Sequence, residues 1–501
     1  MLHFLRKTLL LTFSLFTGLA VYAQSRSKVE ILGANNFEYI KTGGVQISKL
    51  IGNVKMKHQN TWMYCDSALL YETENKVEAF SNVRINHNDS VTITGNYLLY
   101  DGNTRKAFIT QDVQMVDKSM TLSTQQLDYD LNNQLGYYTN GGTIISTDNK
   151  LTSEIGYYYS RQREFFFKRN VVLVNPDYTI KSDTLMYNTF TKIAYFFGST
   201  NIKGKSEEIF CENGWYNTVK DLSQFSRNAV LFTDKTMLSA DSLFYDRKAR
   251  LGKAFRNIHI YDSAQKIHLY GDYGQSNGRT NISYVNKKSY AIKLMGKQDS
   301  LFLFADTLLL FQKERNQKQM LKAFHQVKLF KPDLQAVCDS LVYMSDDSSM
   351  RLYHKPVIWS GKNQVSADTI IFFINKGKLD SFNFLNDAFL VSKEKGAHYN
   401  QIKGKNMFGN MDSTSIKIMY VYGNAQSIHY EKEDSLRYIG INKIDCSEMV
   451  FSFSRGQMEK AVFIKDAEAT MYTLDELKPE ELRLNGFKWQ EKRRPQKLYF
   501  Q

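Results

Sequence analysis

One acidic position recurs along the chain and is the first candidate for chemistry. It stands between a small residue and a hydroxyl residue, in a phrase that continues with Leu or Ile, any residue and an aromatic residue, most clearly at 240–245. Asp183, Asp339 and Asp368 occupy the same position in other copies, as does Asp241 in this one. A row of carboxylates could bind a cation or act in general acid–base catalysis.

The spacing of this position favours a structural role instead. Positions 96, 125, 154, 183, 212 and 241 follow one another at 29 residues, and the first two hold Asn96 and Gln125. Carboxylates on successive rungs of two strands would lie roughly 10 Å apart, whereas a hard cation needs several oxygens around one point. We interpret the acid as a residue at a strand bend that accepts a hydrogen bond from a neighbouring N–H.

Other catalytic patterns are not found in the sequence. The histidines form no close metal-binding pair of the His-x₃-His kind. There is no Gly-x-Ser-x-Gly, no phosphate-binding glycine-rich loop and no Cys-His dyad in a known context. The sequence therefore predicts no enzyme, no cofactor and no metal site.

The elements that carry the acid are predicted to be strands. Each copy has two short phrases rich in β-branched and aromatic residues that alternate with period two, such as 77–85 and 96–100. About thirteen copies of about 29 residues fit between residues 45 and 472. Two strands cannot bury an apolar face alone, whereas stacked copies can. We predict an all-β array, either a solenoid or a sheet folded along its length.

The four cysteines occupy the small-residue slot before the acid. Cys65, Cys211, Cys338 and Cys446 stand where other copies have Ala240, Ser182 or Gly95. A free cysteine behaves as a small buried apolar residue. Copies that are rungs apart cannot bring two Cα atoms within about 7 Å, so we expect no disulfide.

The ends of the chain differ from the array. Residues 1–23 have a charged start, an apolar run and small residues before Gln24, as in a removable signal peptide. Residues 24–273 are predicted as a first lobe and 274–473 as a second, although a single continuous array is equally compatible with the sequence. Residues 474–501 are predicted as a short helix, 474–484, and a basic tail.

The net charge favours anionic partners. The formal charge is +14 at pH 7, and such an excess attracts phosphate-bearing or acidic partners, or simply keeps the protein soluble. An exported protein rarely meets nucleic acid, so we expect phosphorylated lipid or glycan and no nucleic acid.

One face of the strands is apolar in every copy. It is either a closed core or an open trough that accepts acyl chains, because both need an apolar interior. If it is a trough, its predicted lipid-contacting residues are Val54, Met56, Val83, Ile85, Leu98, Tyr100, Val113, Met115, Leu127, Tyr129, Val171, Leu173, Leu185, Tyr187, Leu243, Tyr245, Ile258 and Ile260.

The repeats resemble a known family. The phrases at 52–56, 63–71 and 76–80 resemble the LptA/OstA family of lipopolysaccharide-transport proteins, and the resemblance recurs over roughly residues 30–470. It implies a twisted β-jelly-roll folded into a V-shaped trough, along which acyl chains slide toward the outer membrane. This chain has far more repeats than the small bridging member of the family.

From this resemblance we predict a conduit or chaperone for lipopolysaccharide or a related glycolipid, located in the periplasm either free or associated with the outer membrane. Lys55, Lys57, Arg84 and Arg105 are predicted to contact phosphates at the rim. The terminal strands would add to other β-jelly-roll transport components, with peripheral contact to membrane proteins. The alternatives are a closed β-solenoid spacer or surface adhesin without lipid, and a repeat-fold enzyme acting on polysaccharide.

Overall fold

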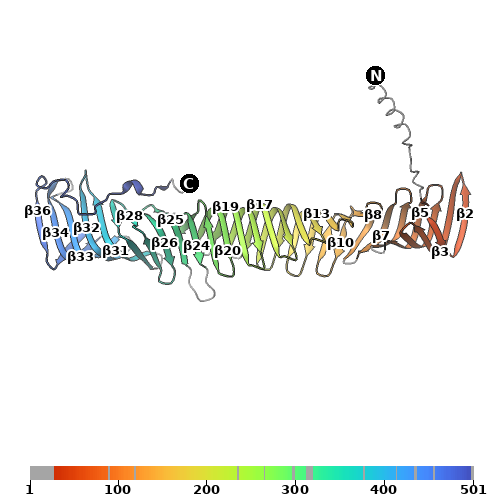
Figure 1. Ribbon diagram of the computed structural model, residues 1–501, viewed down its shortest axis with the longest axis horizontal. Helices are drawn as coiled ribbons and strands as arrows, with labels where there is room; N and C mark the ends of the chain where they lie inside the picture. The colour runs from red at the N-terminus through yellow and green to blue at the C-terminus, as the bar shows by residue number, and fades with distance from the viewer. Residues whose placement is uncertain are drawn as a thin grey trace, which may run out of the picture. The chain divides into compact units, whose positions relative to one another are not determined.

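The computed structural model describes eleven stretches of the chain: 27–88, 91–117, 120–233, 236–263, 266–295, 299–311, 320–375, 378–412, 415–433, 437–454 and 457–497. The predicted signal peptide, residues 1–23, lies outside the described residues. The described chain is almost entirely β-strand, and neighbouring strands pair in antiparallel fashion, which confirms the predicted all-β class (Figure 1).

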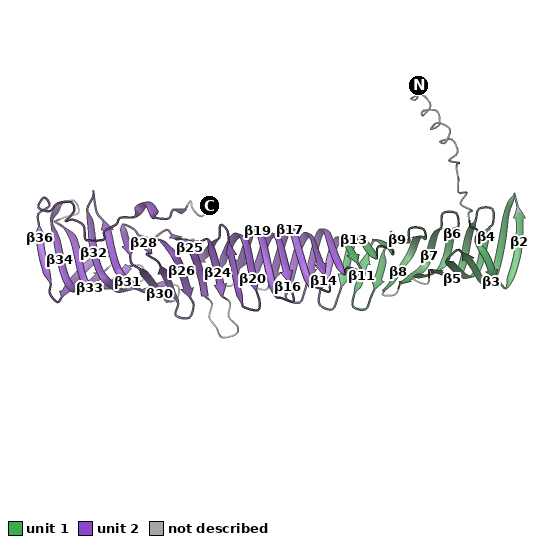
Figure 2. Ribbon diagram, viewed as in Figure 1, with its two compact units in different colours: residues 1–176, 186–190 green, residues 177–185, 191–501 purple. Residues whose placement is uncertain are grey.

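The chain divides into two compact units (Figure 2). Unit 1 comprises residues 1–176 and 186–190, and unit 2 comprises residues 177–185 and 191–501. The predicted lobe boundary between residues 273 and 274 falls inside unit 2, within strand β20 (Ile267–Asn277). This strand pairs with β19 on both sides of that point, through Phe255↔Tyr273 and Ala254↔Gly274, so the ladder is continuous there.

Unit 1 is a meander in which each long strand pairs with the next. Its strands are β1 (Glu30–Gly33), β2 (Asn36–Thr42), β3 (Val45–His58), β4 (Thr61–Tyr71), β5 (Lys76–His87), β6 (Val91–Asp101), β7 (Lys106–Asp117), β8 (Met120–Asp130), β9 (Leu135–Tyr138), β10 (Gly142–Ile145), β11 (Lys150–Ser153), β12 (Ile155–Tyr159) and β13 (Glu164–Val174).

Unit 2 continues the same pattern, and the units divide within β14. The strands are β14 (Thr179–Asn188), β15 (Ile193–Lys203), β16 (Glu207–Asn217), β17 (Leu222–Thr233), β18 (Thr236–Asp246), β19 (Leu251–Asp262), β20, β21 (Ile282–Asn286), β22 (Tyr290–Met295), β23 (Asp299–Phe304), β24 (Thr307–Phe311), β25 (Met320–Lys331), β26 (Leu334–Met344), β27 (Ser349–Tyr353), β28 (Val357–Ser360), β29 (Asn363–Ser366), β30 (Thr369–Asn375), β31 (Lys378–Lys393), β32 (Tyr399–Asp412), β33 (Ser415–Lys432), β34 (Tyr438–Ser454), β35 (Gln457–Ile464) and β36 (Glu468–Tyr472).

Each long strand bends near its middle, and the bend folds the sheet along its length. In β4 the pairing register shifts between Tyr64 and Ser67. Met63 is buried before this shift and Ala68 after it. One residue left out of the ladder exchanges the two faces of a strand. Both halves of the strand therefore point their apolar residues into the same interior, as predicted for a folded sheet.

The recurrent acid stands at this bend and is bonded to the next strand. In several copies the Asn 16 residues later adopts a positive φ and donates its side-chain amide to the acid: Asn82 to Asp66 (2.7 Å), Asn228 to Glu212 (2.7 Å) and Asn257 to Asp241 (3.0 Å). Asp183 instead accepts from the backbone N–H of Ser199 at 3.0 Å. The acid is thus a structural bend residue that accepts from a neighbouring N–H, as predicted, and the donor in several copies is a side-chain amide.

The turns between strands lie along the two edges of the folded sheet. We call the edge with the turns after β4, β6 and β8, and after β16, β18 and β20, lip A. The edge with the turns after β3, β5 and β7, and after β15, β17 and β19, is lip B. The two lips border the mouth of the interior within each unit.

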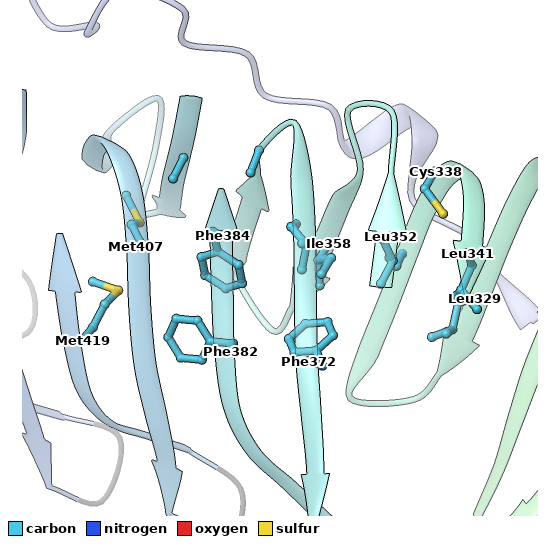
Figure 3. Packing of buried hydrophobic residues seen from close by; sticks show 14 of the residues in the cluster. Leu329, Cys338, Leu341, Leu352, Ile358, Phe372, Phe382, Phe384, Met407 and Met419 are labelled. Atoms are coloured by element: carbon cyan, nitrogen blue, oxygen red, sulfur yellow. The ribbon is translucent and has the colours of Figure 1, made fainter. Parts of the chain in front are cut away.

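The second half of unit 2 has a closed core. Figure 3 shows Phe372, Phe382 and Phe384 beside Met407 and Met419, and the rings of Phe382 and Phe384 stack with centroids 4.4 Å apart. The small residue that precedes the recurrent acid points into this core, and in the other repeats it points into the interior of the folded sheet. All four cysteines are buried there and free.

The C-terminal segment packs on the outside of unit 2. Its path over β31 to β25 is visible in Figure 1. Gln401 donates to the carbonyl of Leu482 at 2.8 Å and accepts from the N–H of Leu484 at 2.9 Å. Gln364 makes the same pair of bonds with Lys488 and Gln490, both at 2.7 Å.

The predicted short helix at 474–484 is wrong. That segment forms turns and bends, and the helical turn of the described C-terminal segment is a 3₁₀ turn at Glu491–Arg493. Pro479 lacks the N–H that a helix needs. The apolar residues Leu477, Leu482 and Leu484 pack against the outer face of the sheet, which an irregular chain can cover.

Candidate functional site

An apolar groove lies in unit 2. Strands β14 to β25 surround a volume of about 810 Å³. Aliphatic and aromatic side chains dominate its lining, among them Ile180, Phe196, Leu231, Leu238, Ile260 and Leu269. Leu238, Ile260 and Leu269 are direct neighbours across three consecutive strands. They form a continuous apolar floor, a surface that can accept hydrocarbon.

In unit 1, the residues at the repeat position of Leu238 are covered by other side chains. Ile93 and Leu122 precede Leu238 by whole multiples of 29 residues, and they are 1% and 3% exposed. Leu238 itself is only partly buried. The residue type is thus similar in all three copies, and the difference lies in what covers them.

A column of six tyrosines shows where the interior opens. Tyr100, Tyr129, Tyr158, Tyr187, Tyr216 and Tyr245 follow at 29 residues on strands that end at lip A. Tyr100 and Tyr129 are 1% and 2% exposed, whereas Tyr245 is 44% exposed. The side chain is identical, so its surroundings decide whether it is covered.

In unit 1 these tyrosines meet residues of lip B and close the mouth. The Nδ1 atom of His58, at the end of β3, lies 2.6 Å from the phenolic oxygen of Tyr100. The ring of His87 packs edge-on against Tyr129 with centroids 6.5 Å apart. The hydroxyl of Tyr158 donates to Asp117. We call these three pairs the closing contacts.

Burial keeps the histidine–tyrosine pairs uncharged. It lowers the pKa of His58 and of His87 below the ordinary value of 6.5, and the charge of Arg105 lowers both further. Burial also raises the pKa of Tyr100 and of Tyr129 to about 12. At neutral pH all four rings are therefore neutral, which suits a contact that is shut off from water.

Among the described residues of the groove, no such contact is found at Tyr245. The residue 42 positions before Tyr245, the spacing of His58 from Tyr100, is Lys203. Lys203 is exposed at lip B, and a long amphipathic side chain of this kind directs its polar end toward solvent and not across an apolar mouth. At the β14 end of the groove, Tyr178 still packs edge-on against Tyr216 at 6.3 Å. The mouth opens beyond that pair.

The structure places the predicted apolar residues in three settings. Leu243, Tyr245, Ile258 and Ile260 line the groove. Leu173 and Tyr187 are partly buried and Leu185 is buried, and none of them lines it. The others lie in the closed interior of unit 1, at most 2% exposed: Val54, Met56, Val83, Ile85, Leu98, Tyr100, Val113, Met115, Leu127, Tyr129 and Val171.

Sequence reasoning missed several residues of the groove floor. Leu231, Leu238 and Leu269 stand on the lip B halves of their strands and were not among the predicted set. The signal was present, since Leu238 keeps the 29-residue spacing from Ile93. A second signal of the open groove was that the lip B position occupied by His58 in unit 1 is occupied by Lys203 in the repeat beside the groove.

Three of the predicted rim cations point away from the mouth. The Nζ atoms of Lys55 and Lys57 lie 4.9 and 4.8 Å from the ring centroid of Trp62, and Arg84 lies 4.7 Å from that of Tyr64. Lys55 and Lys57 alternate with the buried Val54 and Met56, so they stand on the outer face of the sheet. Arg105 does lie at lip A, in the turn before β7.

The fold and the groove define a class of protein: a β-repeat protein whose folded antiparallel sheet encloses an apolar interior that is open along part of its length. Residues 26–183 match the family described as OstA-like protein, and residues 295–378 match the LptA/(LptD N-terminal domain) LPS transport protein family. These two segments of the chain are LptA/OstA-like.

Other comparisons add little. A crystal structure of LptH, the LptA-homologous periplasmic component of the lipopolysaccharide transport device of Pseudomonas aeruginosa, is similar at 7% identity and a TM-score of 0.17, over 29% of this chain and 81% of that one. No curated protein matched the sequence.

Within the described residues, no three His, Cys, Asp or Glu side chains gather as a metal site would require. Nor does any described helix reach the length and apolarity of a membrane span.

Proposed function

We propose that this protein carries the acyl chains of lipopolysaccharide, or of a related glycolipid, in the groove of unit 2 as a non-enzymatic component of the periplasm. The observation that carries the proposal is the partly exposed apolar floor of Leu238, Ile260 and Leu269. A protein that only needs a core has no reason to leave these side chains uncovered, because each buried CH₂ stabilises by about 0.8 kcal/mol.

The size of the groove suits a chain-like ligand. About 810 Å³ falls within the range of roughly 300–1,000 Å³ typical of ligand sites. Apolar contact with several methylene groups gives affinity without a specific polar partner, so chains of different length could bind and move along the floor. The match of residues 295–378 to an LPS transport protein family supports this choice of ligand, and with the OstA-like match of residues 26–183 it supports the periplasm as the location.

The ends of the array support partners that add strands. Strand β2 pairs with β3, and among the described strands no other partner covers its second edge. Phe37 and Tyr39 on β2 are both more than half exposed. An unpaired edge with apolar side chains is a template for another strand. We propose that β2 joins another β-jelly-roll transport component, with peripheral contact to membrane proteins.

The alternative of a closed spacer or adhesin fits unit 1 better than unit 2. The closing contacts seal the interior of unit 1, as a pure spacer requires. A protein that serves only as a spacer does not need the open groove of unit 2. The lipid proposal therefore rests on unit 2, and a lipid-free groove would favour the spacer.

The test is to purify the protein from its native envelope and identify bound lipid by mass spectrometry. Wild type should retain glycolipid, whereas Leu238→Trp with Leu269→Trp should lose most of it because the indole rings fill the groove. Met237→Trp is the matched control, since Met237 neighbours Leu238 and does not line the groove. Absence of lipid from wild type, or equal retention by the filled variant, would refute the proposal.

A further inference from the structure

The turns of lip A beside the groove carry two kinds of cation. One kind holds the turns together. Lys248 donates to the carbonyl of Val219 in the preceding turn at 2.7 Å, and Arg279 donates to the carbonyl of Lys248, also at 2.7 Å. These side chains run along the lip from turn to turn. Their donors are engaged by backbone and are not presented to the groove.

The second kind lines the groove and has no ion pair. Arg247 and Arg250 are lining residues from the β18–β19 turn. Lys253 precedes the buried, inward-facing Ala254 on β19, so its side chain stands on the outer face of the sheet. Within the described part of unit 2, no carboxylate lies within 4.0 Å of either guanidinium. The stem of Arg250 passes over Gly278, where an added Cβ would come within 3.2 Å of the arginine Cβ. The absence of a side chain at Gly278 leaves room for that stem.

The nearby acids already have partners. Asp221, in the preceding turn of lip A, accepts from the hydroxyl of Tyr216 at 2.9 Å. On lip B, Asp177 pairs with Lys205 at 2.9 Å, and this bond lowers the pKa of Asp177. Glu207 accepts from Ser206. Among the described residues, the cations at the mouth without an ion pair are therefore Arg247 and Arg250, and the Arg247 guanidinium also interacts with the Tyr216 hydroxyl and the charge of Asp177.

We propose that Arg247 and Arg250 form a phosphate-headgroup site at lip A, so that the groove selects amphiphiles whose acyl chains are attached to a phosphorylated head. The chains lie on the floor beside Leu238 and Ile260, and the head stays at the lip. Arginine is suited to this role because its planar fork donates two parallel hydrogen bonds to phosphate oxygens. The inference rests on the proposed function and adds its headgroup selectivity.

The test compares two amphiphiles of equal chain length on the full mature chain. Dodecyl phosphate and dodecyl maltoside are titrated by calorimetry below their micelle-forming concentrations. Wild type should bind the phosphate at least about tenfold more tightly, with a preference that shrinks as salt rises. In Arg247→Gln with Arg250→Gln the preference should fall to about twofold or less, while maltoside binding stays unchanged and reports an intact groove.

The control variant is Lys220→Gln. Lys220 is an exposed cation of a lip A turn that does not line the groove, so this variant should keep the wild-type preference. Equal binding of both amphiphiles by wild type would overturn the headgroup site, as would an equal loss of preference in Lys220→Gln. If neither amphiphile binds, the apolar groove itself, and hence the proposed function, is wrong.

Discussion

The imidazole of His58 and the phenol of Tyr100 lie 2.6 Å apart, and their hydrogen bond joins the two lips of unit 1. His58 ends strand β3 at lip B, and Tyr100 stands near the end of β6 at lip A. Both side chains are almost fully buried. The same tyrosine position recurs at Tyr245, where the lip B partner is replaced and the interior is open.

The first prediction compares these two tyrosines. Tyr100→Phe leaves the buried Nδ1 atom of His58 without a partner, so it should lower the free energy of unfolding by about 1–3 kcal/mol. Tyr245→Phe should change it by less than about 0.5 kcal/mol, because Tyr245 is exposed. Hydrogen exchange of β3 to β6 measures the first effect locally. Equal protection in the two variants would show that the closing contact does not stabilise unit 1.

The second prediction concerns pH. Burial lowers the pKa of His58 and His87 below 6.5, so as pH falls below about 6.5 the unfolded chain takes up protons that the folded chain does not. The stability of unit 1 should be complete above that pH and should decline below it, toward the lowered pKa values. Urea midpoints measured at about pH 7.5 and pH 5.5 test this.

A double variant, His58→Gln with His87→Gln, separates these residues from other titrating groups. It should be less stable than wild type at neutral pH, and its stability should depend less on pH between the two conditions. The same decline in wild type and variant would assign the pH dependence to other residues.

The third prediction concerns the C-terminal segment. Gln401 is fully buried and holds both the carbonyl of Leu482 and the N–H of Leu484. Gln401→Ala should raise the exchange of residues 482–490, because the loss of two hydrogen bonds weakens docking by about 2 kcal/mol. Gln426→Ala removes a bond to Asp445 instead and should leave the segment protected. Unchanged exchange in Gln401→Ala would mean that apolar packing alone holds the segment.

The fourth prediction concerns the bend. Asn257 has a φ of 50° and donates to Asp241 at 3.0 Å. Asn257→Val should lower the free energy of unfolding by about 1–3 kcal/mol, since a β-branched residue is strained at positive φ. Asn257→Gly keeps the backbone conformation accessible and loses mainly the exposed hydrogen bond, so its melting temperature should lie between those of wild type and the Val variant. An equal loss in the Gly and Val variants would place the stabilisation in the side-chain bond, which both of them lack.

Much of the fold follows from local repetition. The 29-residue spacing, the period-two alternation and the small slot that holds Cys65 or Ala240 each need only neighbouring strands, and these are the features that the sequence predicts correctly. The apolar face is also predicted correctly as an inward face. The short helix failed because the surface that Leu477, Leu482 and Leu484 cover belongs to strands far away in the chain.

The sequence by itself determined that the chain would stack copies of one bent, two-stranded unit with an apolar interior. Only the tertiary structure decided which copies are closed and which are open. Closure depends on pairs such as His58 with Tyr100, which come from different strands and meet across the mouth only when the sheet has folded. The sequence of a single repeat does not specify such a contact between distant strands. Leu243 and Tyr245 therefore line an open groove because no described residue of the opposite lip covers them, and not because of their own residue types.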